Sequence, residues 1–195
     1  GCGASGRLGS ESAENHGSTH ASSGFFLRIP LHATQRAEQV AAGYHFTCLV
    51  LSDGSVQCFG AGDNGQLGYG NENNLSDQPG YSATAEGSVS IVGGKGPLRV
   101  SCGVAHCCAA LASGGVQCWG DGGDGQLGYG NDNAIGNDEA ASAGGLVLLH
   151  AGKFAVSVGC GEVHSCALLD TGQVQCWGKG DKGRLGYGNE DTIGK

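Results

Sequence analysis

The sequence predicts an all-β fold built from repeats, and three observations lead there. A motif recurs at residues 44–71, 104–131 and 162–189. Each copy contains short apolar runs separated by glycine, aspartate, asparagine and serine, a pattern typical of short strands joined by turns. The copies begin about 60 residues apart, and a repeat of that length is long enough for a four-stranded blade. These observations favour a partial β-propeller.

Each repeat is expected to contribute four antiparallel strands. The first ends in glycine (EQVAAG, LRVSCG and VSVGCG), and the second follows it (TCLVL, CCAAL and SCALL). The third contains VQCF or VQCW, and a fourth apolar segment (FFLRI, VSIV or LVLLH) comes after a polar insert. We therefore predict one repeat domain over residues 1–195. It comprises a partial blade at 1–43 and repeats at about 44–103, 104–161 and 162–195.

Composition excludes several classes of function. The net charge is −8, and only 10 Lys and Arg residues are spread along the chain, whereas nucleic-acid binding needs basic side chains gathered on one face. No apolar run approaches the roughly 20 residues of a membrane helix. Hydrophobic residues make up 39% of the chain, which is enough for a packed core. Because the chain contains no methionine, we expect a processed form or part of a longer protein.

The repeat resembles a known family. The pattern G-x-x-H-x-C-A-L-x-x-x-G-x-V-x-C-W-G, followed by G-x-x-G-x-L-G-Y-G, is similar to that of the regulator of chromosome condensation repeat family. Its best carriers are Gly161, His164, Ala167, Leu168, Gly172, Val174, Trp177, Gly178, Gly183, Leu185 and Gly186. The resemblance implies a seven-bladed propeller, of which this chain would supply about three to three-and-a-half blades.

Three pairs of cysteines are predicted to form disulfides across hairpins. They are Cys48 with Cys58, Cys108 with Cys118, and Cys166 with Cys176. A three-residue loop lies midway in each hairpin, with Gly54, Gly114 and Gly172 at the left-handed position. This loop length places the two cysteines of a pair directly opposite each other. Opposite residues are close enough for a disulfide.

Other arrangements of the cysteines stay open. Reduced cysteines packed as small apolar side chains are one alternative. Zinc is a weaker one, because it needs four converging ligands and each hairpin offers two. Cys102 and Cys160 are expected to be buried thiols, whereas Cys2 and Cys107 have no repeat equivalents and are expected to be free or paired outside the chain.

The predicted disulfides bear on location. They indicate an oxidising compartment, either extracellular or the lumen of an organelle such as the thylakoid, in preference to cytosol or nucleus. Asn74, in the sequence Asn-Leu-Ser, is a possible glycosylation site, which is consistent with secretion.

Several motifs that suggest chemistry are better explained by structure. GKGDKG (178–183) matches a dinucleotide fingerprint, but it recurs and leads into LGYG, which is a poor helix start. His106 and His164 recur at one repeat position, where we expect a hydrogen bond that braces a turn. Trp119 and Trp177 recur at one core position. We assign no catalytic, cofactor-binding or metal-binding residue.

The sequence favours a non-enzymatic scaffold or protein-interaction module. Three blades cannot close a seven-membered ring, so further blades or a protein partner are expected to cover the outermost faces. The inserts at residues 72–87 and 132–145 are candidate contact loops. The alternatives are a guanine-nucleotide-exchange regulator of a small GTPase and an extracellular or lumenal ligand-binding propeller, lectin-like or inhibitor-like.

Overall fold

The structure is a computed structural model of the 195-residue chain, and it describes residues 29, 31 and 34–195 except 77–81, 83 and 95. It contains three antiparallel sheets of three strands each, in the order β1-β2-β3, β4-β5-β6 and β7-β8-β9. The strands are β1 (Ala37–Ala42), β2 (Phe46–Leu51), β3 (Val56–Gly60), β4 (Pro97–Cys102), β5 (His106–Leu111), β6 (Val116–Gly120), β7 (Ala155–Cys160), β8 (His164–Leu169) and β9 (Val174–Gly178). We call these sheets blades 1, 2 and 3. The predicted all-β fold is confirmed.

Helical structure is slight in the described part of the chain. It is limited to the short 3₁₀ segments η2 (Ala141–Gly144) and η3 (Asp181–Gly183). Neither has the length and apolar character that a membrane-spanning helix requires.

The second and third strands of each blade form a tight hairpin, and its geometry follows from the loop. Gly54, Gly114 and Gly172 have φ values of +82°, +85° and +81°, a region that side chains with a Cβ rarely adopt. In blade 1, the amide of Gly54 donates to the carbonyl of Leu51 at 2.8 Å. The turn sets the register, so the two cysteines of each hairpin lie directly opposite each other.

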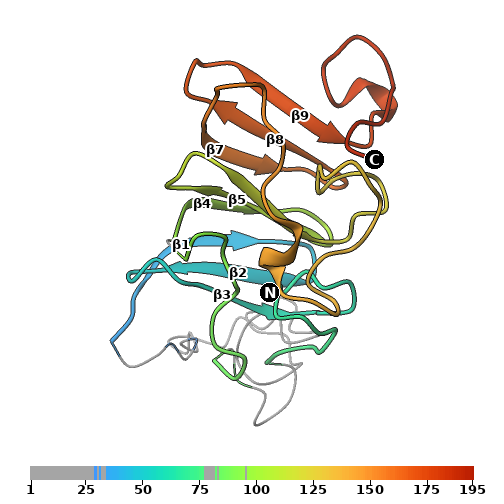
Figure 1. The fold of residues 1–195 in the computed structure, drawn as a ribbon. Coiled ribbons are helices and arrows are strands. Elements are labelled where there is room, and N and C mark those ends of the chain that lie inside the picture. Colours follow the sequence, from blue (N-terminus) through green and yellow to red (C-terminus); the bar gives the residue numbers. More distant parts are fainter. Residues whose placement is uncertain (1–28, 30, 32–33, 77–81, 83, 95) are drawn as a thin grey trace, which may run out of the picture.

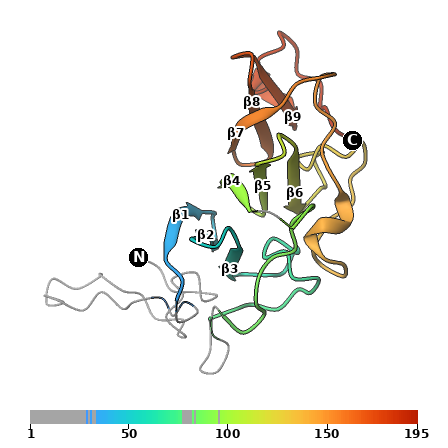
Figure 2. The same ribbon diagram turned by 60° about the vertical axis from the view of Figure 1, so that its left-hand side comes forward.

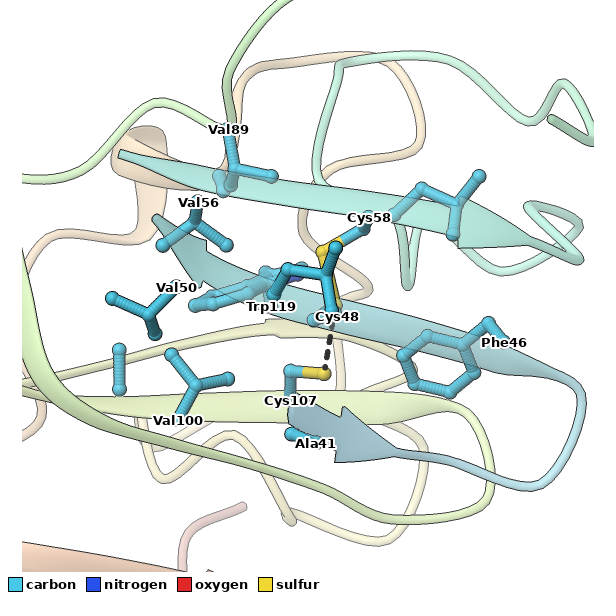
Figure 3. Close-up of a cluster of buried hydrophobic side chains, with 14 of the residues drawn as sticks. Ala41, Phe46, Cys48, Val50, Val56, Cys58, Val89, Val100, Cys107 and Trp119 are labelled. Atoms are coloured by element: carbon cyan, nitrogen blue, oxygen red, sulfur yellow. Dashed lines mark hydrogen bonds between the residues drawn. A yellow bond between two sulfur atoms is a disulfide. The ribbon is translucent and has the colours of Figure 1, made fainter. Parts of the chain in front are cut away.

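The blades lie side by side in chain order (Figure 1). The first strand of every blade is on the same side of the stack, with β1 against β4 and β4 against β7 (Figure 2). We call the face of a blade that points toward the next blade along the chain its trailing face, and the opposite face its leading face. Side chains from a trailing face and the next leading face form each core. In Figure 3, Val50 and Val56 of blade 1 pack with Val100 and Trp119 of blade 2.

The predicted fourth strand is absent from the described residues. The segment that contains Val89 makes one ladder-like bond, from its amide to the carbonyl of Val56 at 2.8 Å. Further along it, the amide of Val92 bonds instead to the side-chain carbonyl of Gln117 in blade 2, also at 2.8 Å. The segment therefore links two blades and does not extend one sheet. The FFLRI segment lies almost wholly outside the described residues.

A tyrosine completes the outer edge of each blade. The hydroxyl of Tyr69 accepts a hydrogen bond from the amide of Cys58 at 2.8 Å and donates one to the carbonyl of Cys58 at 3.0 Å. Tyr129 and Tyr187 bind the backbones of Cys118 and Cys176 in the same way. These hydroxyls occupy backbone groups that a fourth strand would need, which explains the three-stranded sheets.

Candidate functional site

The tryptophans join neighbouring blades. The indole Nε1–H of Trp119 in blade 2 donates to the carbonyl of Gln66 in blade 1 at 3.1 Å, and that of Trp177 in blade 3 donates to Gln126 in blade 2 at 2.9 Å. Both side chains are buried. They occupy the same position in successive leading faces and satisfy their polar group across the junction.

His106 also acts across a junction. Its ring lies over Gly103, where a Cβ would come within 2.4 Å of the ring, so the glycine of G-x-x-H makes room for the imidazole. Its Nε2 is 2.9 Å from Ser165 Oγ in blade 3, whereas the turn before the strand is closed by backbone bonds. The hydroxyl of Ser165 donates a hydrogen bond to the backbone carbonyl of Gln126 at 2.9 Å, so the Nε2–H of His106 is the donor to Ser165 Oγ. The bond that we expected to brace a turn therefore spans two blades.

Burial decides the charge of the two recurring histidines. Loss of water lowers the pKa of His106 to about 4, which keeps the ring neutral at physiological pH. His164, at the same position in blade 3, is half-buried, and desolvation lowers its pKa as well. Its ring lies over Gly161, so the pairing of glycine with a ring is repeated.

The structure places all three predicted cysteine pairs at bonding distance. The S–S distances are 2.12 Å for Cys48–Cys58, 2.11 Å for Cys108–Cys118 and 2.11 Å for Cys166–Cys176. All three pairs lie on trailing faces. The first two are covered by the next blade, whereas Cys166 is partly exposed.

The structure differs from our expectation at Cys102 and Cys107. These residues lie opposite each other on β4 and β5, and their sulfurs are joined at 1.99 Å. Neither is therefore a free thiol in this structure. The repeat pattern does not predict this pair, because its equivalent in blade 3 is Cys160 opposite Ser165. Cys160 stays a thiol, and burial raises its pKa to about 11.

Two groups of ligand atoms converge between blades. The first sulfur cluster consists of Cys48 and Cys58 from blade 1 and Cys102 and Cys107 from blade 2. The sulfurs of Cys48, Cys102 and Cys107 lie within 4.8 Å of one another. The Sγ atoms of Cys48 and Cys107 are 3.6 Å apart across the junction (Figure 3).

The second sulfur cluster lies between blades 2 and 3. It consists of His106, Cys108, Cys118 and Cys160, and the ligand atoms of His106, Cys108 and Cys160 lie within 4.8 Å of one another. Ser165 Oγ is in their midst, 3.4 Å from the sulfur of Cys108 and 3.8 Å from that of Cys160.

Sequence reasoning missed these clusters because it treated each hairpin separately. The members of a cluster come from consecutive repeats, and only the stacking of blades brings their side chains together. One signal was available. Aligning the repeats shows that Phe46 and Cys107, at the first junction, correspond to His106 and Ser165 at the second. The two exchanges occur at the same junction.

Asn74 has a structural role in this fold. Its Oδ1 accepts a hydrogen bond from the amide of Gly62 at 2.9 Å, and Ser76, the third residue of the sequon, is fully buried. Thr192 makes the equivalent contact with Gly180 in blade 3. This arrangement favours a loop-closing role for Asn74 over an accessible glycan acceptor.

The repeats differ most in the exposure of their trailing faces, and the trailing face of blade 3 is the most exposed. Its open positions are Leu168, Val174, Tyr187 and Ile193, which are 40%, 58%, 47% and 38% exposed. At the first two positions, blade 2 has Ala110 and Val116, both 0% exposed, and blade 1 has Val50 and Val56, at 6% and 0%. We call these four residues the open face.

A groove lies beside this face, between blades 2 and 3. Its volume is about 640 Å³, and its lining includes Tyr129, Leu146, Trp177 and Ile193.

At the junction of blades 1 and 2, the amide of Ala141 in η2 bonds to the carbonyl of Gly68 at 3.3 Å, and Ala141 is completely buried. The insert at 132–145, which we predicted to contact partners, thus folds back partly over an earlier junction.

The fold and the open face together define a class: a repeat protein of the β-propeller type, present here as a partial ring of blades. The model of the regulator of chromosome condensation (RCC1) repeat matches residues 37–66, 99–126 and 155–184. The chain therefore belongs to the RCC1 repeat family, as its motif indicated.

Curated relatives are much longer than this chain. The E3 ubiquitin-protein ligase HERC2 of Homo sapiens is 30% identical over 210 residues, which cover 99% of this chain and 4% of HERC2. The probable E3 ubiquitin-protein ligase HERC6 of Homo sapiens is 33% identical over 153 residues, which cover 78% of this chain and 14% of HERC6.

Solved structures support the fold. Human WBSCR16 superposes with a TM-score of 0.64 at 21% identity, covering 84% of this chain and 40% of that protein. Yeast RCC1 (Prp20), solved bound to Kap60, gives a TM-score of 0.58 at 20% identity. The match covers 78% of this chain and 32% of the yeast chain. At these identities the likeness concerns the fold.

Proposed function

We propose that this chain is a non-enzymatic protein-interaction module whose open face receives a further blade of the same repeat type. The observation that carries this is the contrast at equivalent positions. Side chains that blades 1 and 2 bury under the next blade are largely exposed on blade 3. A group of exposed apolar side chains of this kind marks an interaction surface.

The backbone supports the same partner. In blades 1 and 2, the carbonyls of Val56 and Val116 each accept a hydrogen bond, from the amides of Val89 and Val147 at 2.8 Å. No segment in the described part of the chain supplies this bond to Val174. An incoming repeat would supply this single bond from its own apolar segment, as the segments of Val89 and Val147 do in blades 1 and 2.

An extended chain tests the proposal. A copy of residues 138–178 is joined after Lys195, which keeps the repeat in register because Ile193 and Gly194 correspond to Ile135 and Gly136. We expect amide hydrogen exchange in residues 165–178 to slow by at least about tenfold, because the added blade covers the open face. Val174→Asp in the extended chain should abolish that protection.

The matched control is Val40→Asp, which changes an exposed valine on blade 1. This variant should leave the protection on blade 3 unchanged. The proposal fails if the added repeat folds without protecting residues 165–178, or if it does not fold onto the chain. The same repeat offered in trans should protect these residues in a saturable manner.

The finer expectations from sequence stay predictions. A second solved structure of the yeast protein Prp20p is described together with its binding properties to Gsp1p and histones. An exchange-factor role for this chain would require a GTPase-binding surface. The lectin-like or inhibitor-like alternative and the oxidising compartment are also predictions of the sequence.

A further inference from the structure

The two sulfur clusters are unusual because each gathers four metal-ligand side chains from two blades. At the first, Cys58 is bonded to Cys48, so a fourth sulfur adjoins the three that lie within 4.8 Å of one another. At the second, Cys118 is bonded to Cys108 in the same way. One hairpin supplies only two ligands, but the stacking of blades brings four together.

The spacing fits a tetrahedral ion. A zinc–sulfur bond is about 2.3 Å long, which puts two sulfurs of one tetrahedron about 3.8 Å apart. The sulfurs of Cys48 and Cys107, which face each other from different blades, are 3.6 Å apart. Two opposed hairpins can therefore hold one ion between them with small side-chain adjustments.

The two junctions differ by a compensating exchange. The first has Cys107 and, beside it, Phe46, which cannot bind a metal. The second has Ser165 in place of that cysteine and His106 in place of that phenylalanine. The ligand lost at one position is thus matched by one gained at a neighbouring position. The ligand sets become four cysteines and three cysteines with one histidine, both of which are common structural zinc sites.

We propose that, while its cysteines are thiols, the chain binds one zinc ion in each sulfur cluster and so fastens blade 1 to blade 2 and blade 2 to blade 3. Each ligand thiol gives its proton to solvent, so four protons leave at the first cluster and three at the second. At the second cluster the Nε2 of His106 supplies its lone pair, and its proton moves to Nδ1. Nδ1 has no hydrogen-bond partner in this structure.

The same cysteine sulfurs can either bind zinc or form disulfides, but they cannot do both at once. Closing a disulfide removes two electrons and two protons and requires an oxidant, whereas zinc binding to thiols requires none. The disulfides join strands within a blade, but zinc would join neighbouring blades.

Metal content tests the proposal directly. The chain, with Cys2→Ser so that every remaining cysteine is a described one, is prepared anaerobically with a phosphine reductant and zinc and then gel-filtered. We expect about two zinc ions per chain by elemental analysis. Cobalt substituted for zinc should give the intense visible absorption of tetrahedral cobalt thiolates. Cys102→Ser and His106→Phe should each lower the content to about one.

The repeats supply matched controls. Cys166→Ser with Cys176→Ser should leave about two ions bound, because no other described cysteine or histidine groups with that pair. His106→Phe with Ser165→Cys gives the second junction the ligands of the first and should restore the ion lost in His106→Phe. Circular dichroism checks that each variant is folded.

Three results would overturn the proposal. One is a reduced, folded chain that retains less than about half a zinc ion. Another is a loss of metal in the Cys166 and Cys176 control as large as that in Cys102→Ser. The third is a failure of the double variant to regain the ion lost in His106→Phe.

Discussion

The trailing faces of blades 2 and 3 come from nearly the same sequence and have different surroundings. Val116 in blade 2 is completely buried beneath blade 3, whereas Val174, its counterpart, is more than half exposed. Both follow a hairpin with a glycine at positive φ and precede a cysteine that faces the same way. The difference shows that the repeat encodes the blade, while burial of its apolar face depends on a neighbour.

The largest effect is expected from a charge at these matched positions. Val116→Asp places a carboxylate in a dry junction and should cost at least about 5 kcal/mol in the free energy of unfolding. Val174→Asp should change it by less than about 0.5 kcal/mol, because water reaches that side chain. Urea unfolding of both variants measures the contrast. Equal losses would show that the open face is not open in solution.

A smaller effect is expected from the tryptophan of the first junction. Trp119→Ala should destabilise the chain by about 4 kcal/mol, because it removes a fully buried ring between blades. Trp119→Phe should cost about 1–2 kcal/mol, since blade 1 already has a phenylalanine, Phe59, at this position and only part of the ring and the bond to Gln66 are lost. Urea midpoints at constant m-value give both numbers. A Phe variant as unstable as the Ala variant would contradict this account.

The tyrosine at the blade edge should matter less. Tyr129→Phe leaves the amide and carbonyl of Cys118 without their shared partner and should cost about 1–2 kcal/mol. Tyr187→Phe should cost less than about 0.5 kcal/mol, because Tyr187 is exposed and water can replace its hydroxyl. Thermal unfolding of the two variants separates them. If both variants lose the same stability, the edge bonds do not depend on burial.

The smallest effect is a pH dependence. Burial raises the pKa of Tyr129 from 10.0 to about 12. The unfolded chain therefore loses this proton at lower pH than the folded chain, and stability falls as pH rises through this interval. Between pH 10 and 11 the loss should be about 1 kcal/mol, and Tyr129→Phe should remove that part of the slope. An unchanged slope in the variant would show that Tyr129 does not cause it.

The two sulfur clusters, like the burial of the apolar faces, depend on the presence of a neighbouring blade. Cys108 and Cys166 occupy the same position, but among the described residues only Cys108 lies in a group of metal-ligand side chains, because blade 3 brings the thiol of Cys160 to Cys108 and His106 of blade 2. Two residues at each junction then decide the ligand set: Phe46 and the facing Cys107 at the first, and His106 and the facing Ser165 at the second.

The features of this protein that depend on residues close together in the chain could be predicted from the sequence. The positions of the strands, the three-residue turns and the opposition of Cys48 to Cys58 follow from alternation, from glycine at positive φ and from the two-residue period of a strand. These features depend on residues within one hairpin. The fourth strand was predicted wrongly, because the hydroxyl of Tyr69, eleven residues from Cys58, fills the edge instead.

The repeat sequence by itself determined the first three strands of each blade, the register of the second and third strands, the turn between them and the cysteine pair. Only the tertiary structure decided what each blade faces, and so it alone revealed the pairing of Cys102 with Cys107, the bond from His106 to Ser165 and the exposure of Val174. The physical reason is the distance along the chain between the residues that interact. Backbone conformation is set by neighbours along the chain, whereas burial and ligand geometry depend on residues nearly 60 positions away that only packing brings together.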